Sequence, residues 1–265
     1  MRLNPFKKRK PLVSVLRLEG VIAAGGRRAP VLNDHGMAVT IEKAFSKGKP
    51  SAVAIVVNSP GGSPVQSSLI GERIRRLADR RSIPVYAFVE DLAVSGGYWI
   101  AASADEIHAD ACSIIGSIGV ISSSFGFHEV LGKIGVERRV YTAGENKGML
   151  DPFLPEDPKD VERLRILQDV LHGKFIEIVK ARRGDRLNGE DLFTGKFWTG
   201  EKAVELGLID GIGTVVPKMQ EIFGEDVRFR RYARRLPFPM NVSSEFAGSV
   251  ADMLEERTMR ARFGL

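Results

Sequence analysis

The sequence predicts an α/β fold in which crossover helices connect a mostly parallel sheet, built as a single domain with a C-terminal appendage. From residue 12 to about residue 223, short β-branched runs alternate with stretches of helical periodicity, which is typical of strand–helix–strand units. The 265 residues, 43% of them hydrophobic, suffice for one sizeable core. We therefore expect a basic arm at residues 1–11, a main domain at 12–227 and a tail at 228–265.

Each expected element rests on residue pattern and on capping signals. The run at 52–60 begins with six apolar residues, 52–57, so we expect a strand buried on both faces. Asn33 or Asp34 is positioned to cap one helix, and Ser63 followed by Pro64 marks the start of the next. We expect strands at 13–22, 52–60, 84–90, 106–110, 117–122 and 138–144, helices at 33–48, 64–81, from Ser95 onward and at 158–182, a loop at 91–94, and a short capped helix within 198–214.

Basic residues are concentrated in two short segments. The net charge is +6, yet residues 2–10 and 228–235 each hold five lysines or arginines and no acid, so the rest of the chain is net acidic. This distribution favours contact of the chain ends with an anionic membrane surface or an acidic partner over a nucleic-acid groove across the body. No apolar run is long enough for a membrane span, and we expect a cytoplasmic protein, with peripheral attachment at the inner membrane surface left open.

Two glycine-bearing turns follow predicted strands, in "VVNSPGGSP" and "EDLAVSGGYW". Glycines at such turns allow close backbone approach, so that amide N–H groups from both turns can face one crevice and hold an oxyanion. Ser95 lies at the start of a helix, where the dipole favours developing negative charge. We interpret Ser95 as a candidate nucleophile; the alternative is that its hydroxyl only caps the helix.

A serine nucleophile needs a proton acceptor. The four histidines show no Ser/His/Asp arrangement, and we interpret His108 as structural. Lys147, in "YTAGENKGML", lies between two glycines in a predicted loop. If that loop covers the crevice, desolvation favours the neutral amine, which can act as a base; otherwise Lys147 is an ordinary exposed lysine.

Cys112 is the single cysteine, so a disulfide framework within the chain is excluded. We expect Cys112 to pack in the interior.

Four motifs occur in order: "NSPGGS", "VSGGYWIAASADEI", "GSIGV" and "AGENKGMLDPF", followed by "TGEKAVELGLID". Together they resemble the signal peptide peptidase SppA family, the S49 serine peptidases, in their short, single-domain type, over about residues 12–216. The resemblance implies a crotonase-like or Clp-protease-like fold. It implies that Ser95 is the nucleophile, that Lys147 is the general base, that Ser117 orients the lysine amine, and that the oxyanion donors are the N–H groups of Gly96 and of Gly62 or Gly61.

The resemblance also implies partners. It points to short, apolar, extended peptides as substrates, such as signal-peptide remnants, and to a homo-oligomer in which the lysine of one subunit completes its neighbour's site. Members of the family typically carry an N-terminal membrane anchor, which this sequence does not show. No cofactor, metal or nucleotide motif is evident. Two alternatives stay open: a crotonase-type acyl-CoA enzyme, and a non-catalytic scaffold at a membrane surface.

Overall fold

The computed structural model describes residues 10–25, 31–233 and 257–263. Its elements belong to two compact units, one made of residues 1–118 and 176–265 and the other of residues 119–175. In chain order they are β1 (Leu12–Glu19), α1 (Asp34–Ser46), β2 (Ala52–Ser59), α2 (Pro64–Arg81), β3 (Val85–Val94), α3 (Gly96–Ala101), β4 (Glu106–Ala109), β5 (Ile114–Gly116), α4 (His128–Lys133), α5 (Pro158–Arg183), a 3-10 turn (Gly184–Arg186), β6 (Phe197–Thr199), α6 (Gly200–Glu205), β7 (Gly211–Ile212), α7 (Val215–Phe223) and β8 (Arg228–Tyr232).

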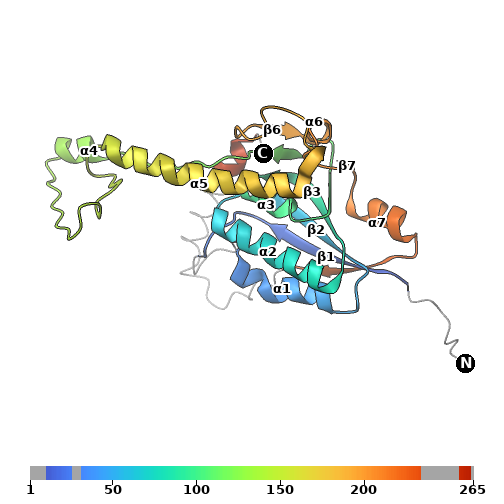
Figure 1. Cartoon of the computed structure of the whole chain (residues 1–265). Helices are drawn as coiled ribbons and strands as arrows, with labels where there is room; N and C mark the ends of the chain where they lie inside the picture. Colours follow the sequence, from blue (N-terminus) through green and yellow to red (C-terminus); the bar gives the residue numbers. More distant parts are fainter. Residues whose placement is uncertain (1–9, 26–30, 234–256, 264–265) are drawn as a thin grey trace, which may run out of the picture. The chain divides into compact units, whose positions relative to one another are not determined.

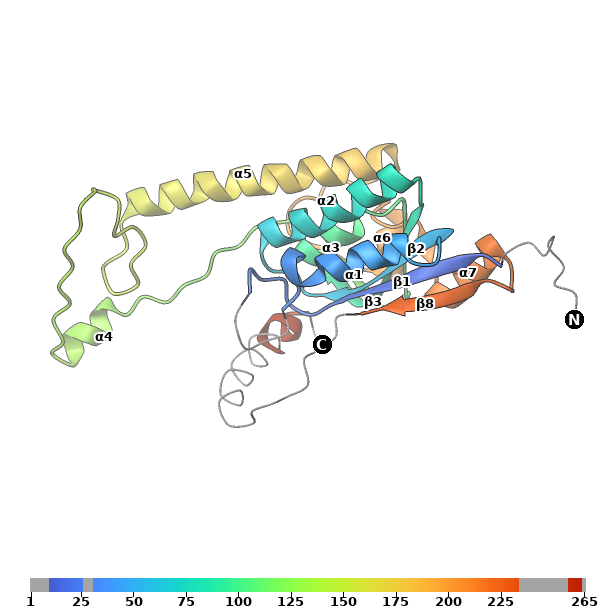
Figure 2. The same ribbon diagram turned by 90° about the horizontal axis from the view of Figure 1, so that it is seen from below.

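The first unit is built on an eight-stranded sheet with the order β6-β5-β3-β2-β1-β8; β4 pairs with β3 and β7. Every pairing among these strands is parallel except β5 with β6. Helices α1 and α2 lie side by side on one face of the sheet (Figures 1 and 2). The predicted α/β class with a mostly parallel sheet and crossover helices is confirmed.

Both faces of the central strand are buried, as its sequence predicts. All eight residues of β2 are buried. On one face, Ala52 and Ala54 pack with Met219 of α7 and Phe88 of β3. Two capping predictions are also confirmed: the Asn33 side chain accepts the Gly36 N–H at 2.7 Å, and Ser63 accepts the Gln66 N–H at 3.4 Å. These helices therefore begin at the predicted residues.

Strand β3 is longer than predicted. Residues 91–94, expected as a loop, continue the strand: its first half pairs with β4 and its second half, from Leu92, pairs with β5. Glu90 and Asp91 are exposed between these halves. Their charges have partners, because Glu90 pairs with Arg17 at 2.7 Å and Asp91 accepts a hydrogen bond from Asn58 at 2.7 Å. Two consecutive charged residues, Glu90 and Asp91, are typical of a loop, and this is why the sequence pattern predicts one here.

The tail expected from Arg228 onward begins with a strand of the sheet. Strand β8 pairs with β1 in parallel register, from Leu12 opposite Arg228 to Leu16 opposite Tyr232. Phe229 packs against the core cluster that contains Met219. The amphipathic part of the tail and the basic arm lie largely outside the described residues. The domain limits at 11/12 and 227/228 stay predictions.

The second unit contains α4 and the first part of α5 and, within residues 119–175, no strand. The strands expected at 117–122 and 138–144 are therefore not formed; the strand that does form, β5, comes just before the first of them. Their β-branched residues have no partner strand, and several side chains are exposed, among them Ile121 (67%) and Tyr141 (91%). Periodicity alone does not show whether a pairing partner exists.

Candidate active site

Ser95 follows the last residue of β3 and precedes α3, as predicted. Its backbone lies at φ 53°, ψ −125°, an unusual conformation for a residue other than glycine. Its N–H donates to the Gly116 carbonyl at 2.8 Å and its carbonyl accepts the Trp99 N–H at 3.0 Å. The Ser95 side chain makes no capping hydrogen bond to α3. The alternative that Ser95 serves as a helix cap is therefore not supported, and a strained backbone held by its neighbours is typical of functional positions.

The glycines after Ser95 are required by close packing. A Cβ atom on Gly96 would lie 2.3 Å from Ser67 Oγ, and one on Gly97 would lie 2.5 Å from the Ser59 carbonyl oxygen. Helix α3 therefore sits directly against the end of β2 and the start of α2. Gly96 is also the first residue of α3, and the first N–H groups of a helix have no acceptor within it.

The second glycine turn lies against Ser95. A Cβ atom on Gly61 would lie 2.8 Å from the Gly96 nitrogen and 2.8 Å from the Ser95 Cβ. Gly61 and Gly62 have positive φ values of 93° and 135°, which a side chain disfavours. The predicted neighbourhood of the two turns is thus present, because β2 and β3 are adjacent strands in the sheet.

Ser59 also belongs to this site, although no role for it is predicted from the sequence. Its hydroxyl donates to the Gly20 carbonyl at 2.7 Å and accepts the Gly61 N–H at 3.2 Å. The Gly61 N–H is therefore already engaged. Ser59 stands next to the glycines in "NSPGG", and that adjacency is the only signal of its role in the sequence.

Ser117 follows the last residue of β5 as Ser95 follows the last residue of β3. Val94 and Gly116 are register partners, so the two serines leave neighbouring strands at the same level, where strands lie roughly 5 Å apart. Ser117 also has a positive φ, 51°, and its N–H donates to the Lys196 carbonyl at 2.7 Å. The structure thus brings Ser95, Ser117, Gly96 and the Gly61–Gly62 turn together within the first unit.

Lys147 belongs to the second unit. It is exposed and lies in a turn, where its N–H donates to the Gly144 carbonyl at 3.2 Å. Two contacts hold this turn to the start of α5: the Leu150 N–H donates to Asp160 at 3.1 Å, and Arg163 hydrogen-bonds Asn146. The lysine is therefore presented at the surface of a fixed loop.

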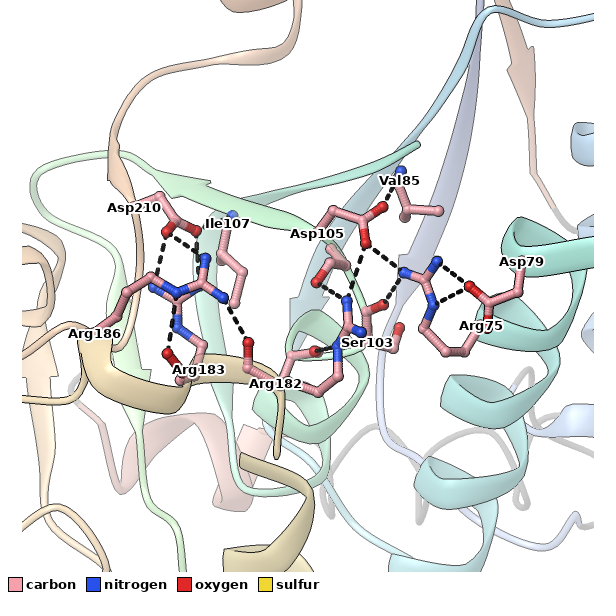
Figure 3. A network of polar contacts seen from close by, with 12 residues as sticks. Arg75, Asp79, Val85, Ser103, Asp105, Ile107, Arg182, Arg183, Arg186 and Asp210 are labelled. Atoms are coloured by element: carbon pink, nitrogen blue, oxygen red, sulfur yellow. Dashed lines mark hydrogen bonds and ion pairs between the residues drawn. The ribbon is translucent and has the colours of Figure 1, made fainter. Parts of the chain in front are cut away.

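The far end of α3 is fixed by arginines (Figure 3). Arg182 donates to the Ala104 carbonyl at 2.9 Å and to Asp105 at 3.1 Å, and Arg75 reaches Ser103 and Asp105 at 3.1 and 2.8 Å. Cations near the C-terminal end of a helix complement its dipole. These contacts keep the helix that begins next to Ser95 in a fixed position.

A second arginine cluster surrounds Asp210 (Figure 3). Arg183 forms two bonds to this carboxylate at 2.7 and 3.1 Å, Arg186 adds one at 3.0 Å, and the Ile107 N–H donates at 2.7 Å. Burial by itself raises the pKa of Asp210, but the bonds from Arg183 and Ile107 and the nearby positive charges outweigh burial and lower the pKa below its usual value. Close by, the buried Tyr98 hydroxyl of α3 donates to the Leu208 carbonyl at 2.7 Å.

His108 and Cys112 lie outside the proposed site, and their burial differs. His108 is buried and stacks on Phe88 with ring centroids 5.6 Å apart, in agreement with a structural role. The expectation that Cys112 packs in the interior is wrong: Cys112 is exposed in the turn between β4 and β5, where its N–H donates to Asp110 at 2.9 Å. Apolar neighbours in sequence do not bury a residue that lies in a turn.

The model of peptidase family S49 matches residues 78–222, more than half of the chain. The chain belongs to peptidase family S49. The match includes Ser95, Ser117 and Lys147, whereas the Gly61–Gly62 turn precedes it.

Two relatives with protease names agree with S49 membership, and a third relative has a different name. The chain is 32% identical over 207 residues to "Protease 4" of Haemophilus influenzae, with 76% of this chain and 33% of that protein aligned. It is 30% identical over 207 residues to "Serine protease SPPA, chloroplastic" of Arabidopsis thaliana, with 73% and 30% aligned. A "Na(+)/H(+) antiporter NhaA" of Brucella melitensis is 46% identical over 284 residues, with 100% and 39% aligned. The chain thus spans 30–39% of the length of these relatives.

A solved structure shares the fold. A mutant of the 1510-N membrane-bound stomatin-specific protease superposes with a TM-score of 0.52 at 16% identity, covering 87% of this chain and 100% of that one. Identity this low supports the fold alone. Among the helices of the described residues, none is long and apolar enough to cross a membrane.

Proposed function

We propose that this S49 family member is a serine endopeptidase in which Ser95 is the nucleophile and Lys147 the general base. The observation that carries the proposal is the strained Ser95 backbone, in direct contact with the Gly61 turn and with the strand that leads to Ser117. Acyl transfer requires a nucleophile with hydrogen-bond donors beside it, and here the ends of adjacent strands place backbone groups around one half-buried serine. The same placement has no evident use in a helix cap.

The proposed reaction runs in two balanced steps. The neutral Lys147 amine takes the Ser95 hydroxyl proton while Oγ attacks the scissile carbonyl carbon, and the oxygen of that carbonyl becomes an oxyanion. When the C–N bond breaks, the leaving amine receives the proton from Lys147 and an acyl-serine remains. Water then attacks the ester carbonyl and gives a proton to the Lys147 amine; when the bond from the carbonyl carbon to Ser95 Oγ breaks, the lysine returns this proton to Oγ and the acid is released. Ser117 is proposed to orient the amine.

We assign the oxyanion donors to the N–H groups of Gly96 and Gly62. Gly96 begins α3, where the N–H has no helical acceptor. Between the two glycines of the other turn, Gly61 already donates to Ser59, which leaves Gly62. Preorganised backbone donors of this kind typically contribute 10²- to 10³-fold in rate.

The Gly61 turn gives a specific steric test. Gly61→Ala places a methyl group only 2.8 Å from the Ser95 Cβ and the Gly96 nitrogen, at a backbone φ of 93°, so we expect kcat/KM for peptide hydrolysis to fall by about 10²-fold or more. Gly213→Ala is the matched control, because its nearest atom, Lys218 Cβ, is 3.9 Å away. Unchanged kcat/KM in folded Gly61→Ala would remove this turn from the site.

The proposed substrates are short, apolar, extended peptides such as signal-peptide remnants. The resemblance to the S49 family supports this class, and the surroundings of Ser95 are apolar: it follows the buried segment Leu92–Val94, and Ile22 packs against Gly96. Fluorogenic apolar peptides test the class. Cleavage by the full chain supports the proposal, whereas hydration of an enoyl-CoA without peptide cleavage would favour the crotonase alternative.

We also propose a homo-oligomer in which Lys147 completes the site of a neighbouring subunit. The second unit exposes many large apolar side chains for its size, a sign of a protein interface. They are Ile121, Phe125, Phe127, Val130, Ile134, Val136, Val140, Tyr141, Leu150, Phe153, Leu154, Ile166, Leu167, Val170 and Leu171. A second copy of the chain would cover this surface and bring a lysine loop with it.

Mixed subunits test the sharing. Ser95→Ala and Lys147→Ala proteins, each inactive alone, are expected to regain about a quarter of the wild-type rate when dissociated together and reassembled in equal amounts, because random neighbours then supply one intact pair in about four sites. The measurement is peptide hydrolysis after remixing. Assembled mixtures that stay inactive would show that each subunit uses its own lysine.

A further inference from the structure

A hollow of about 440 Å³ lies at the edge of the sheet where β2 and β3 begin. The last turns of α1 and α2 form its sides. It is lined by Phe45, Ser46, Lys49, Pro50, Ser51, Arg81, Ser82 and Ile83, which we call the basic pocket. Since β2 has eight residues, this edge is roughly 25 Å from the edge that carries Ser95.

The basic pocket combines two cations with three hydroxyl groups. Lys49 and Arg81 are exposed, and no acidic side chain of the described residues pairs with either of them. Lys49 and Ser82 both have left-handed backbones, with φ 54° and 52°. At Ser82 this conformation is the left-handed C-cap that ends α2. The pocket thus offers two cations without an acidic partner among the described residues and the hydroxyl groups of Ser51 and Ser82, whereas the Ser46 hydroxyl already donates to the Glu42 carbonyl at 2.7 Å.

The rim of the basic pocket is also positively charged. Lys43 lies in the last turn of α1 and Arg80 in the last turn of α2. Arg230 of β8 reaches Gly48, next to Lys49: its Nη1 lies 3.1 Å from the Cβ position of that glycine. The chain enters the first unit beside this rim, since Arg228 donates to the Lys10 carbonyl at 3.5 Å, and five of residues 2–10 are basic.

Three acids near this rim are already paired, and a fourth, Glu225, lies exposed beside Asp226. Asp226 binds Lys10 at 2.6 Å, Glu42 binds Arg73 at 3.3 Å and Asp79 binds Arg75 at 2.7 Å. Positive charge is therefore in excess at this edge, although the chain without its two basic segments is net acidic. A field of this kind attracts anions.

We propose that the basic pocket and its rim bind phosphate groups of anionic phospholipids at a membrane surface. Lysine, arginine and serine side chains are the usual donors to phosphate, and Phe45, Pro50 and Ile83 give the pocket an apolar wall. Several cations around one pocket suit an array of headgroups better than one soluble phosphate. Docking by this edge leaves the Ser95 edge open to peptides.

The test is sedimentation of the full chain with phosphatidylcholine vesicles, with and without phosphatidylglycerol. We expect binding to the anionic vesicles only, and a loss of about tenfold to thirtyfold in partition coefficient for Lys49→Gln/Arg81→Gln, from the usual contribution of each basic residue near such a surface. The matched control is Lys133→Gln/Arg165→Gln, two exposed basic residues of the second unit, which should change binding less than twofold.

Three results would overturn the proposal: equal losses in both double variants, which would indicate net charge alone; release of the protein from vesicles by low-millimolar inorganic phosphate, which would indicate a soluble ligand; or binding to an oligonucleotide but not to vesicles. Peptide hydrolysis by Lys49→Gln/Arg81→Gln in solution should equal the wild-type rate. The membrane proposal and the peptidase proposal can therefore fail separately.

Discussion

Ser95→Ala is expected to lower kcat/KM for peptide hydrolysis by about 10³-fold or more without changing the melting temperature. Alanine retains the Cβ and so makes the same demand on the φ 53° backbone, while the hydroxyl that would form the acyl bond is gone. Loss of one member of a nucleophile–base pair typically costs about as much as loss of both. Lys147→Ala should therefore give a similar rate, and the double variant little further loss.

Ser68→Ala is the matched control for this prediction. Ser68 is a serine of α2 whose hydroxyl contacts Glu72 at 3.1 Å and takes no part in the proposed site. Its rate should stay within about twofold of wild type, because surface substitutions away from a site have small effects. Retention of wild-type hydrolysis by Ser95→Ala would instead show that another residue is the nucleophile.

Asp210→Asn is expected to lower the free energy of unfolding by about 3–5 kcal/mol. The substitution leaves the Arg183 guanidinium, whose side chain is 1% exposed, without a countercharge in the interior. Chemical denaturation at pH 7 measures the change. Glu221→Gln is the control: its partner Lys218 is 2.9 Å away, but the Glu221 side chain is 68% exposed, so the loss should be below about 1 kcal/mol.

The difference in free energy of unfolding between wild type and Asp210→Asn, here called the stability gap, should depend on pH. The folded-state pKa of Asp210 lies below its unfolded value, so its stabilising effect is complete above the unfolded pKa of about 3.9 and is lost as the pH falls through the folded pKa. The stability gap should therefore be constant near neutrality and shrink below about pH 4. A gap that stayed constant into that acidic range would contradict the ion-pair explanation.

The sequence predicts the central sheet well because its signals are local. Three local signals each dictate their own backbone within a few residues: the apolar run that begins β2, the caps at Asn33 and Ser63, and the glycines around Ser95. Glycine at 96 and 97 is a steric necessity, and steric constraints of this kind are visible in the sequence. The Ser95 turn could therefore be located before the fold was known.

The remaining features depend on distant residues. Strand β8 forms because an edge of β1 is available, which its arginine-rich sequence does not reveal. The β-branched residues at 138–144 lack a partner strand and stay irregular. The role of Ser59 follows from Gly20, on another strand end. The Asp210 cluster likewise unites the end of α5 with the turn before β7. None of these pairings leaves a periodic signal.

Covalent labelling is the most direct measurement of the central claim that Ser95 is an activated nucleophile. The full chain would be treated with an alkyl fluorophosphonate, which phosphonylates activated serines with loss of fluoride, and the modified peptide would be identified by mass spectrometry. We predict one adduct on Ser95, absent from Ser95→Ala and strongly slowed in Lys147→Ala. No adduct on a folded, assembled protein, or an adduct on a different serine, would contradict the proposed mechanism.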